Sequence, residues 1–221
     1  MTRPSIAQIV GVVFTRADLR RAVRMRNPPD LFELRLDALL ARNDEIKAAI
    51  GDLPAPLIIT ARHPREGGSN RLSAYTRRAL FRRFLLHAAY VDIELRSVRP
   101  LAAILEEAHL KRIGRIVSFH DFNETPSRSR LDEIARTAQS LGADILKITT
   151  RTDTLGQLTR LMDFFWRKRL EMRIAAMGVG RLGRISRIEF ARHHSALNYG
   201  HLGKPQAEGQ LSITQLRRVL Q

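Results

Sequence analysis

Short apolar segments and longer helical segments alternate strictly along this chain of 221 residues. Runs rich in Val, Ile and Leu predict eight strands, at residues 6–13, 31–37, 56–62, 90–95, 115–122, 143–149, 173–177 and 196–202. Stretches with helical periodicity follow them, at residues 16–25, 44–50, 73–89, 100–110, 128–141, 154–170, 185–193 and 213–220. This alternation is typical of parallel strands joined by helical crossovers. We therefore expect a single-domain α/β protein, a (β/α)8 TIM barrel over residues 1–221.

The main alternative fold is an open, doubly wound parallel sheet. Such sheets often carry a G-x-G-x-x-G phosphate loop after the first strand, whereas Gly11 is followed by Val12, Val13, Phe14 and Thr15. The chain length also lies near the lower end of the ~200–250 residues that a barrel needs. Both observations favour the barrel and leave little room for a further domain.

The net charge of +16 raises the question of which class of molecule the protein binds. A basic chain can bind nucleic acid or attract small anions. Here the basic residues are spread through the predicted helices, with no basic tail and no nucleic-acid-binding motif beside them, so nucleic-acid binding is unlikely. No apolar run reaches a membrane span, and the N-terminus lacks the order of a signal peptide. The chain has no Cys, which excludes disulfides, thiolate catalysis and Cys-ligated zinc, and we expect a cytoplasmic protein.

Several predicted strands carry charged residues where parallel strands are normally continuously apolar. The period of two puts Glu33, Arg35 and Asp37 on one face of their strand. The same face of other strands carries Thr60, Arg62, Asp92, Glu94, Ser118, His120 and Lys147. Buried charges are costly unless they are paired. They also gather near the carboxyl ends of the strands, where barrel enzymes have their active sites, which predicts a polar pocket. The alternative is a set of internal ion pairs that only stabilises the fold.

Lys147 lies between two apolar residues of its predicted strand. Burial there, and nearby cations such as Arg35 or Arg62, are expected to lower the pKa of its amine. A neutral amine can attack a carbonyl and form a Schiff base, and His120 can carry protons near neutral pH. Arginines can bind a carboxylate through two hydrogen bonds. These residues indicate an imine-forming enzyme that acts on a small anionic ketone or aldehyde.

A metal site is less consistent with the sequence. His193 and His194 are adjacent, and adjacent residues on a helix do not share a face. Carboxylates such as Glu33 and Asp92 could bind Mg²⁺, but the Arg and Lys residues interleaved with them disfavour a cation site. We therefore expect no metal.

Six groups of motifs occur along the chain: FELRLD at 32–37, TAR at 60–62 with EGG at 66–68, SFHDF at 118–122 with TP at 125–126, ILKI at 145–148, ISR at 185–187 and GQ at 209–210. Together they resemble the type I 3-dehydroquinate dehydratases of the shikimate pathway, in the order typical of that family and over almost the whole chain. The resemblance implies a (β/α)8 barrel that converts 3-dehydroquinate to 3-dehydroshikimate and water through an imine. It implies neither a metal nor an organic cofactor. We expect a homodimer.

The resemblance also implies roles for individual residues. Lys147 resembles the Schiff-base lysine and His120 the general acid/base, while Glu33 is expected to polarise a hydroxyl and to help orient His120. The implied substrate-binding residues are Glu33, Arg35, Arg62, Glu66 from a loop that covers the site, Arg187 as the carboxylate clamp, and Gln206 and Gln210 from the last loop. Another imine-forming barrel enzyme, such as a class I aldolase, is the alternative with the same chemistry.

The chain departs from the family pattern at three places. Gly11 stands where many members have Ser on the first strand, and Gln206 and Glu208 replace the usual Ser and Pro of the final lid loop. The stretch 177–187 is about two residues longer than usual. These departures are expected to affect substrate affinity and lid closure more than the chemistry.

Overall fold

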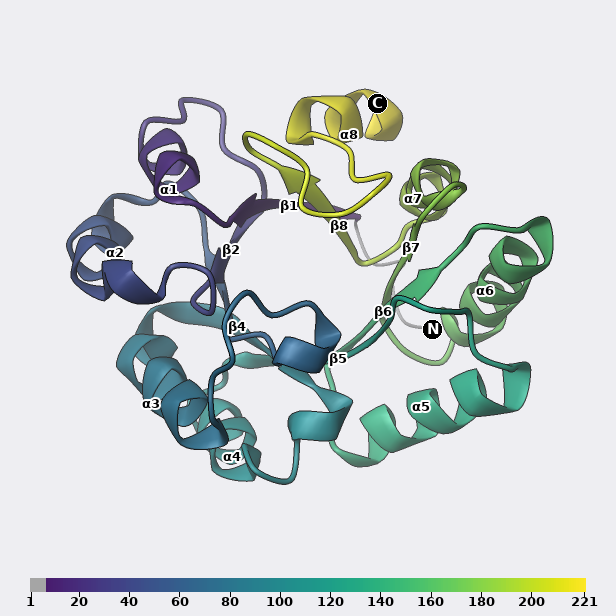
Figure 1. The fold of residues 1–221 in the computed structure, drawn as a ribbon, viewed down its shortest axis with the longest axis horizontal. Helices are drawn as coiled ribbons and strands as arrows, with labels where there is room; N and C mark the ends of the chain where they lie inside the picture. Colours follow the sequence, from purple (N-terminus) through teal and green to yellow (C-terminus); the bar gives the residue numbers. More distant parts are fainter. Residues whose placement is uncertain (1–6) are drawn as a thin grey trace.

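The computed structural model describes residues 7–221, and it consists of a parallel barrel surrounded by helices (Figure 1). The strands are β1 (Gln8–Val13), β2 (Leu31–Arg35), β3 (Leu57–Thr60), β4 (Ala88–Glu94), β5 (Gly114–Asp121), β6 (Ile145–Arg151), β7 (Ile174–Val179) and β8 (Leu197–His201). From β1 to β7 each strand pairs with the next one in the chain, and β8 pairs with β1. This order confirms the predicted (β/α)8 barrel and contradicts the doubly wound alternative.

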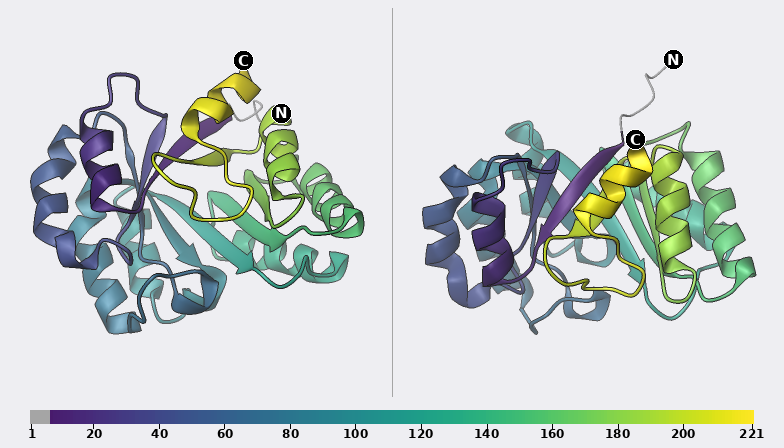
Figure 2. Two further views of the ribbon diagram at one scale, coloured as in Figure 1. Left: turned by 45° about the horizontal axis from the view of Figure 1, so that its top comes forward. Right: turned by 90° about the horizontal axis from the view of Figure 1, so that it is seen from above.

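Helices lie outside the strands all around the barrel (Figure 2). They are α1 (Arg16–Val23), α2 (Asn43–Ala49), α3 (Ala74–Phe84), α4 (Ala102–Leu110), α5 (Arg128–Ser140), α6 (Leu155–Lys168), α7 (Gly183–Arg192) and α8 (Ile213–Leu220). Ser127, Thr154 and Ser212 begin three of them as N-caps, and each side-chain oxygen accepts a backbone N–H three residues further on. No helix within residues 7–221 has the length and apolar character needed to cross a bilayer.

The barrel is nearly closed, with its seam between β7 and β8. These two strands are the edges of the sheet. The Ala196 N–H donates to the carbonyl of Ile174 (2.8 Å), and the Ala176 N–H donates to Ser195 Oγ (3.1 Å). The seam is therefore held near the amino ends of the strands by single hydrogen bonds rather than by a continuous ladder.

The boundaries of some elements differ from the predicted ones. The expected helix at 73–89 ends at Phe84; a 3-10 turn, η4 (Leu85–His87), follows, and β4 begins at Ala88 because this residue already pairs with Leu57 of β3. β2 ends at Arg35, two residues early, because the Asp37 carboxylate accepts the backbone N–H groups of loop residues. The expected start of the first strand, Ile6, lies outside the described residues.

Three apolar clusters position the charged residues. Two lie between the strands and the helices, as expected for the outward alternate positions of each strand. The third fills the barrel interior and includes Val10, Ile58, Ile116, Ile145 and Tyr199. These residues come largely from the first halves of their strands, so they close the amino end of the barrel. Interior space for polar side chains is left at the carboxyl end, where barrel enzymes have their active sites.

Candidate active site

The Lys147 amine lies at the centre of the barrel, and the residue is 4% exposed. Nζ donates to Asp92 Oδ2 (2.9 Å) and to Glu33 Oε1 (3.2 Å), and it sits 3.8 Å from the centre of the Tyr199 ring. The immediate partners of the amine are therefore two carboxylates and an aromatic face. The cations expected beside it are bound to carboxylates of their own, Arg62 to Asp92 and Arg35 to Asp37.

A buried ion-pair network lies beside the lysine. The Arg62 guanidinium donates to both oxygens of Asp92 (3.1 and 2.7 Å), to Glu94 Oε1 (3.1 Å) and to Ser118 Oγ (2.7 Å). Burial alone would raise the pKa of Asp92, but the charges of Arg62 and Lys147 outweigh it and lower that pKa. Burial would likewise lower the pKa of Arg62, whereas Asp92 and Glu94 raise it well above its ordinary value. Both groups are therefore held ionised. Internal ion pairs, which the alternative interpretation of the charged strand residues predicted, are thus present in this part of the barrel.

His120, near the end of β5, has Glu66 as its partner. His120 Nδ1 lies 2.9 Å from Glu66 Oε2, and the backbone N–H of His120 donates to the same oxygen (3.0 Å). Glu66 belongs to the 3-10 turn η3 (Pro64–Glu66) in the connection between β3 and α3, and it is 2% exposed, so the residue is buried within the site. The sequence assigned the orientation of His120 to Glu33. The structure gives this contact to Glu66, while Glu33 accepts from Thr60 and Lys147.

Burial perturbs both members of the histidine–carboxyl pair. It raises the pKa of Glu66 to about 7, against the opposing effect of Arg62 and Arg96. Burial, with the charges of Arg62 and Lys147, lowers the pKa of His120 well below its ordinary value. The imidazole is therefore neutral near neutral pH, which a general base requires.

A cavity of about 140 Å³ opens above these groups. All the residues predicted for the site line it: Glu33, Arg35, Arg62, Glu66, His120, Lys147, Arg187, Gln206 and Gln210. They come from β2, β5, β6, α7 and the connections that follow β3 and β8, and they are brought together only by the closure of the barrel. Their common location agrees with a shared role.

Arg187 on α7 is the most distinctive charge of this cavity. Its Nε donates to the carbonyl of Gly178 (3.2 Å), and within residues 7–221 no carboxylate forms a salt bridge with it. Burial lowers the pKa of its guanidinium to about 10, which leaves it protonated at neutral pH. A buried cation without a carboxylate partner in the described chain is a receptor for an anion.

The last loop closes one side of the cavity. Gln210 Oε1 accepts the backbone N–H of Gln206 (2.7 Å), which fixes the loop, and both side chains line the cavity. Glu208 Oε2 lies 3.7 Å from a guanidinium nitrogen of Arg151 at the end of β6. Of the two departures from the family pattern in this loop, Glu208 therefore contributes a side-chain contact to the barrel, whereas the Gln206 side-chain amide donates to the Lys204 carbonyl within the loop.

Gly11 has a packing role instead. A Cβ at this position would lie 3.0 Å from Pro29, 3.1 Å from Leu202 and 3.2 Å from Phe32. A side chain there would press into the layer between the barrel and its surroundings, while the neighbouring Val12 lines the cavity. The departure at Gly11 thus removes a crowded side chain and no contact to the cavity.

Three residues were missed or left without a role by sequence reasoning. Asp92 was placed in the interior by the alternation of its strand, but no local signal pairs it with Lys147. Tyr199 gives no signal beyond an aromatic residue on the last strand, although its ring lies under the amine. Arg96, which donates to Glu66 (2.7 Å), lies in a 3-10 turn without periodicity. Within residues 7–221, no three His, Asp or Glu side chains are grouped to hold a metal ion.

Comparisons with known proteins agree with this arrangement. The model of the family described as type I 3-dehydroquinase matches residues 11–221. A 3-dehydroquinate dehydratase of Thermococcus gammatolerans is 34% identical over 214 residues, which cover 96% of this chain and 97% of that protein. One of Pyrococcus abyssi is 35% identical over 195 residues, 86% of either chain. The crystal structure of 3-dehydroquinate dehydratase from Geobacillus kaustophilus has a TM-score of 0.81 at 27% identity and covers 99% of this chain and 90% of that one.

Proposed function

The chain belongs to the type I 3-dehydroquinases and is a 3-dehydroquinate dehydratase, a hydro-lyase, and on that premise we propose that Lys147 forms an imine with the substrate. The observation that carries the proposal is the position of the amine. It is buried at the floor of a cavity that also contains a neutral histidine and an arginine with no carboxylate partner in the described chain. These are the groups that imine formation, proton transfer and carboxylate binding need.

Imine formation begins with the loss of a proton from Nζ. The neutral amine adds to the C3 carbonyl of 3-dehydroquinate, and the carbinolamine loses water to give an iminium ion. Glu33 and Asp92 lie 3.2 and 2.9 Å from Nζ, so two carboxylates stabilise the positive charge that the iminium retains. The Tyr199 ring beneath the nitrogen adds a cation–π contact.

His120 carries the proton in the next step. With Glu66 ionised, Nδ1–H donates to Glu66 Oε2, and Nε2 keeps its lone pair toward the reacting carbons. Nε2 removes a proton from C2, which the iminium has acidified, and the electron pair moves toward nitrogen. The imidazolium then returns that proton to the C1 hydroxyl, which leaves as water. Hydrolysis of the imine frees 3-dehydroshikimate and the lysine, so the net change is the loss of one water.

The remaining residues are assigned to binding. Arg187 clamps the substrate carboxylate, because its charge faces the cavity without a carboxylate from the described chain. Arg35, Gln206 and Gln210 line the same cavity, and we assign to them the contacts with the ring hydroxyls. Arg62 lines it too, but its nitrogens are committed to Asp92, Glu94 and Ser118, so its main part is to position that network.

Borohydride trapping tests the imine. Reduction of the enzyme with 3-dehydroquinate present, followed by peptide mass mapping, is expected to give one adduct, on Lys147. The variant Lys147→Ala should give no adduct and lose turnover by several orders of magnitude. Lys168, which pairs with Glu171 on the surface, is the matched control, and Lys168→Ala should behave like the wild type. An adduct on Lys168 or Lys111 would contradict the assignment, and C–C cleavage in place of water loss would indicate an aldolase.

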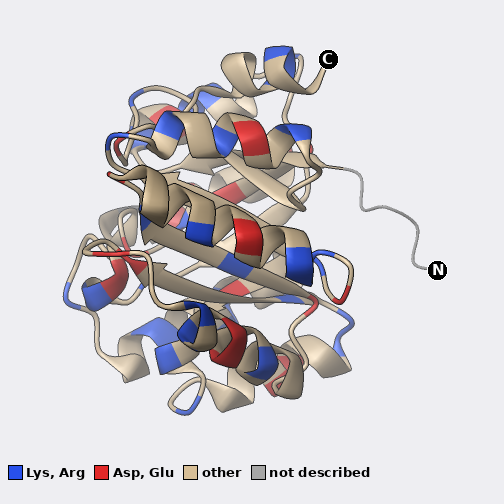
Figure 3. Ribbon diagram, turned by 90° about the vertical axis from the view of Figure 1, so that its right-hand side faces the viewer, with Lys and Arg blue, Asp and Glu red and all other residues tan. Residues whose placement is uncertain are grey.

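Four broader expectations belong to the same proposal: one catalytic domain over residues 1–221, a homodimer, a cytoplasmic location and no nucleic-acid partner. On the side of the barrel shown in Figure 3, basic residues are distributed over several helices and loops and are interspersed with acidic ones. This distribution supports a field that attracts a small anion rather than a docking stripe for a phosphate backbone. Light scattering of the purified protein tests the dimer, and a salt-dependent gel shift tests the last expectation.

A further inference from the structure

A second cavity, of about 520 Å³, lies outside the barrel mouth beside the end of β5. We call it the outer pocket. Its wall includes His120 and Phe122, which also line the catalytic cavity, so the two cavities share these two residues. Nothing in the proposed reaction uses the rest of the outer pocket.

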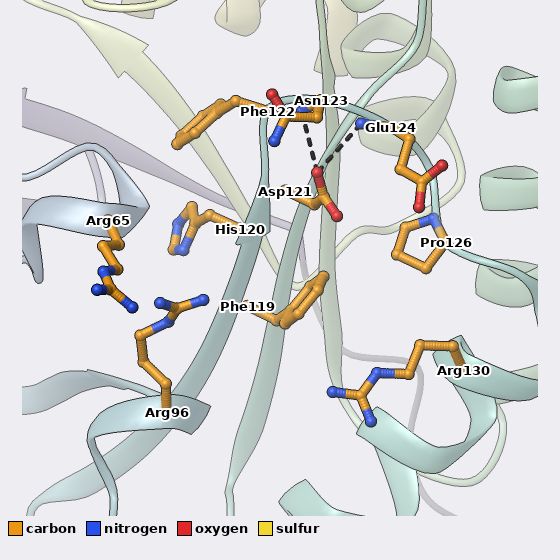
Figure 4. Close-up of a pocket in the computed structure, with 10 residues that line it drawn as sticks. All are labelled: Arg65, Arg96, Phe119, His120, Asp121, Phe122, Asn123, Glu124, Pro126 and Arg130. Carbon is orange, nitrogen blue, oxygen red and sulfur yellow. Dashed lines mark hydrogen bonds between the residues drawn. The ribbon is translucent and has the colours of Figure 1, made fainter.

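Three arginines from separate elements meet there: Arg65 of η3, Arg96 of η5 (Leu95–Ser97) and Arg130 of α5. Figure 4 shows Arg65 and Arg96 approaching from one side and Arg130 from the other, with the Phe119 ring between them. The Arg65 side chain forms no hydrogen bond or ion pair within residues 7–221. Arg130 pairs with Glu133 on the surface (2.7 Å), where solvent screens the pair.

Arg96 donates through Nε to Glu66 (2.7 Å), but within residues 7–221 the two acidic residues that line the outer pocket, Asp121 and Glu124, form no ion pair with its three arginines. Asp121 Oδ1 accepts the backbone N–H groups of Asn123 (2.9 Å) and Glu124 (3.1 Å), the two bonds drawn in Figure 4. The Glu124 carboxyl lies on the side of the pocket away from Arg65 and Arg96 in that view. The part of the pocket next to Arg65 and Arg96 is therefore positive and suits an anion.

The outer pocket also presents aromatic surface. Phe119 and Phe122 both contribute to its wall, and Phe122 is 39% exposed although it is a large apolar residue. Its ring centre lies 6.1 Å from that of His120. A small inorganic anion would satisfy the arginines but leave these rings in water, whereas a flat apolar body attached to the anion would cover them.

We propose that the outer pocket binds a small aromatic carboxylate, with the carboxylate on Arg65 and Arg96 and the ring against Phe119 and Phe122. The guanidinium groups supply paired N–H donors that match a carboxylate, and the phenylalanine rings stack or meet edge to face with the bound ring. The outer pocket thus adjoins the catalytic cavity at His120 and Phe122, while the proposed contacts to Arg65, Arg96 and Phe119 lie outside that cavity.

Arg96 connects this ligand to the catalytic pair. Its Nε donates to Glu66 Oε1 (2.7 Å), while Glu66 Oε2 contacts His120 Nδ1 (2.9 Å). The other charged groups facing Glu66 are Arg62 and Glu94, from the barrel interior. A carboxylate on Arg96 offsets part of the charge that favours ionised Glu66, so the bound ligand makes Glu66 easier to protonate. The acid limb of the pH–rate profile should then move to higher pH. This second effect rests on the proposed function, whereas the binding itself does not.

The binding is tested by fluorine NMR titration of the full-length enzyme with 4-fluorobenzoate, and with uncharged 4-fluorobenzamide as the matched ligand. We expect the carboxylate to bind and the amide to bind at least tenfold more weakly. Arg65→Gln and Arg96→Gln should each weaken the carboxylate at least tenfold. Arg20→Gln, an exposed arginine of α1, and Arg187→Gln, in the barrel, should leave its affinity unchanged.

The contrary results are distinct from one another. Absence of binding, equal binding of the amide, or unchanged affinity in Arg65→Gln and Arg96→Gln overturns the proposal. A tenfold loss in Arg187→Gln also overturns it, because the probe would then be in the catalytic cavity. Saturating 4-fluorobenzoate should shift the acid limb of the pH–rate profile in the wild type. It should not shift this limb in Arg65→Gln, which keeps its activity. An unchanged limb in the wild type overturns the proposed coupling between the bound ligand and Glu66. If borohydride gives no Lys147 adduct while the probe still maps to the outer pocket, the proposed function fails and the ligand site stands.

Discussion

Replacing Glu66 by Gln should make the protein more stable at alkaline pH while making it a poorer enzyme. Burial raises the pKa of Glu66 from 4.5 to about 7, so the folded state resists its ionisation. In the unfolded chain the carboxyl has no such burial and ionises near its ordinary value. At neutral pH the folded protein therefore buries a carboxylate whose charge is disfavoured there, which lowers the free energy of unfolding. Gln carries no charge and removes this destabilisation.

The magnitude follows from the two pKa values. One pH unit of difference corresponds to about 1.4 kcal/mol, so the interval from 4.5 to about 7 corresponds to about 3 kcal/mol. The folded pKa is the higher one, so the folded state binds more protons and stability falls as pH rises. The loss begins above the unfolded pKa and is complete above the folded one. Roughly 2.5 kcal/mol of it falls between pH 5 and 8.

Urea denaturation of the wild type and of Glu66→Gln at pH 5, 6, 7 and 8 measures this term. The difference in the free energy of unfolding, variant minus wild type, should rise by about 2.5 kcal/mol across the series. Glu106→Gln, an exposed carboxyl on α4, is the matched control and should show no comparable rise. Dehydratase activity should fall, because the neutral amide cannot stabilise a protonated His120. A difference between Glu66→Gln and the wild type that stays flat from pH 5 to 8 would refute the reasoning.

The other predictions concern the proton carrier, the anion clamp and the buried network. His120→Ala should slow turnover by ~10²–10⁴-fold and let the covalent adduct accumulate, as seen by intact-protein mass spectrometry after borohydride; wild-type turnover would eliminate His120 as the acid/base. Arg187→Ala should mainly raise KM, and Arg187→Lys should restore it only in part, since Lys lacks the planar fork; an unchanged KM in steady-state assays would refute the clamp. Arg77→Met should destabilise the fold by about 3–5 kcal/mol in urea, because Arg77 pairs with buried Glu94 (2.5 Å). Its neighbour Arg78, half-buried, bonded to the carbonyl of Pro100 and without a carboxylate partner within residues 7–221, is the control, and equal losses in the two variants would contradict the argument.

The difference between Arg77 and Arg78 shows a limit of sequence reasoning. Both stand in the predicted helix at residues 73–89. In the structure Arg77 is 1% exposed and donates to Ala61, Ser97 and Glu94, whereas Arg78 is half-buried and donates to the carbonyl of Pro100. A helical period gives the angle between two side chains on one helix, but the partner on a neighbouring strand is set by packing.

The sequence by itself determined the barrel fold and which polar strand residues face the barrel interior. Strand and helix periods are local properties, because they depend on side chains two to four residues apart. They were sufficient to place Glu33, Lys147 and His120 on interior positions near the carboxyl ends of their strands. Helix capping is local in the same way, since Ser127 accepts the backbone N–H of a residue only three positions away.

What only the tertiary structure decided is which interior groups touch. Glu66 and His120 are 54 residues apart, and Lys147 and Glu33 are 114 apart. Every inward position of a closed barrel faces several others, so the alternation of a strand cannot choose among them. The contacts between interior side chains are set by the register of the strands and by the 3-10 turns after β3 and β4, which bring Glu66 to His120 and Arg96 to Glu66. The outer pocket exists for the same reason, because its arginines come from two connections and helix α5, which meet only when the barrel has closed.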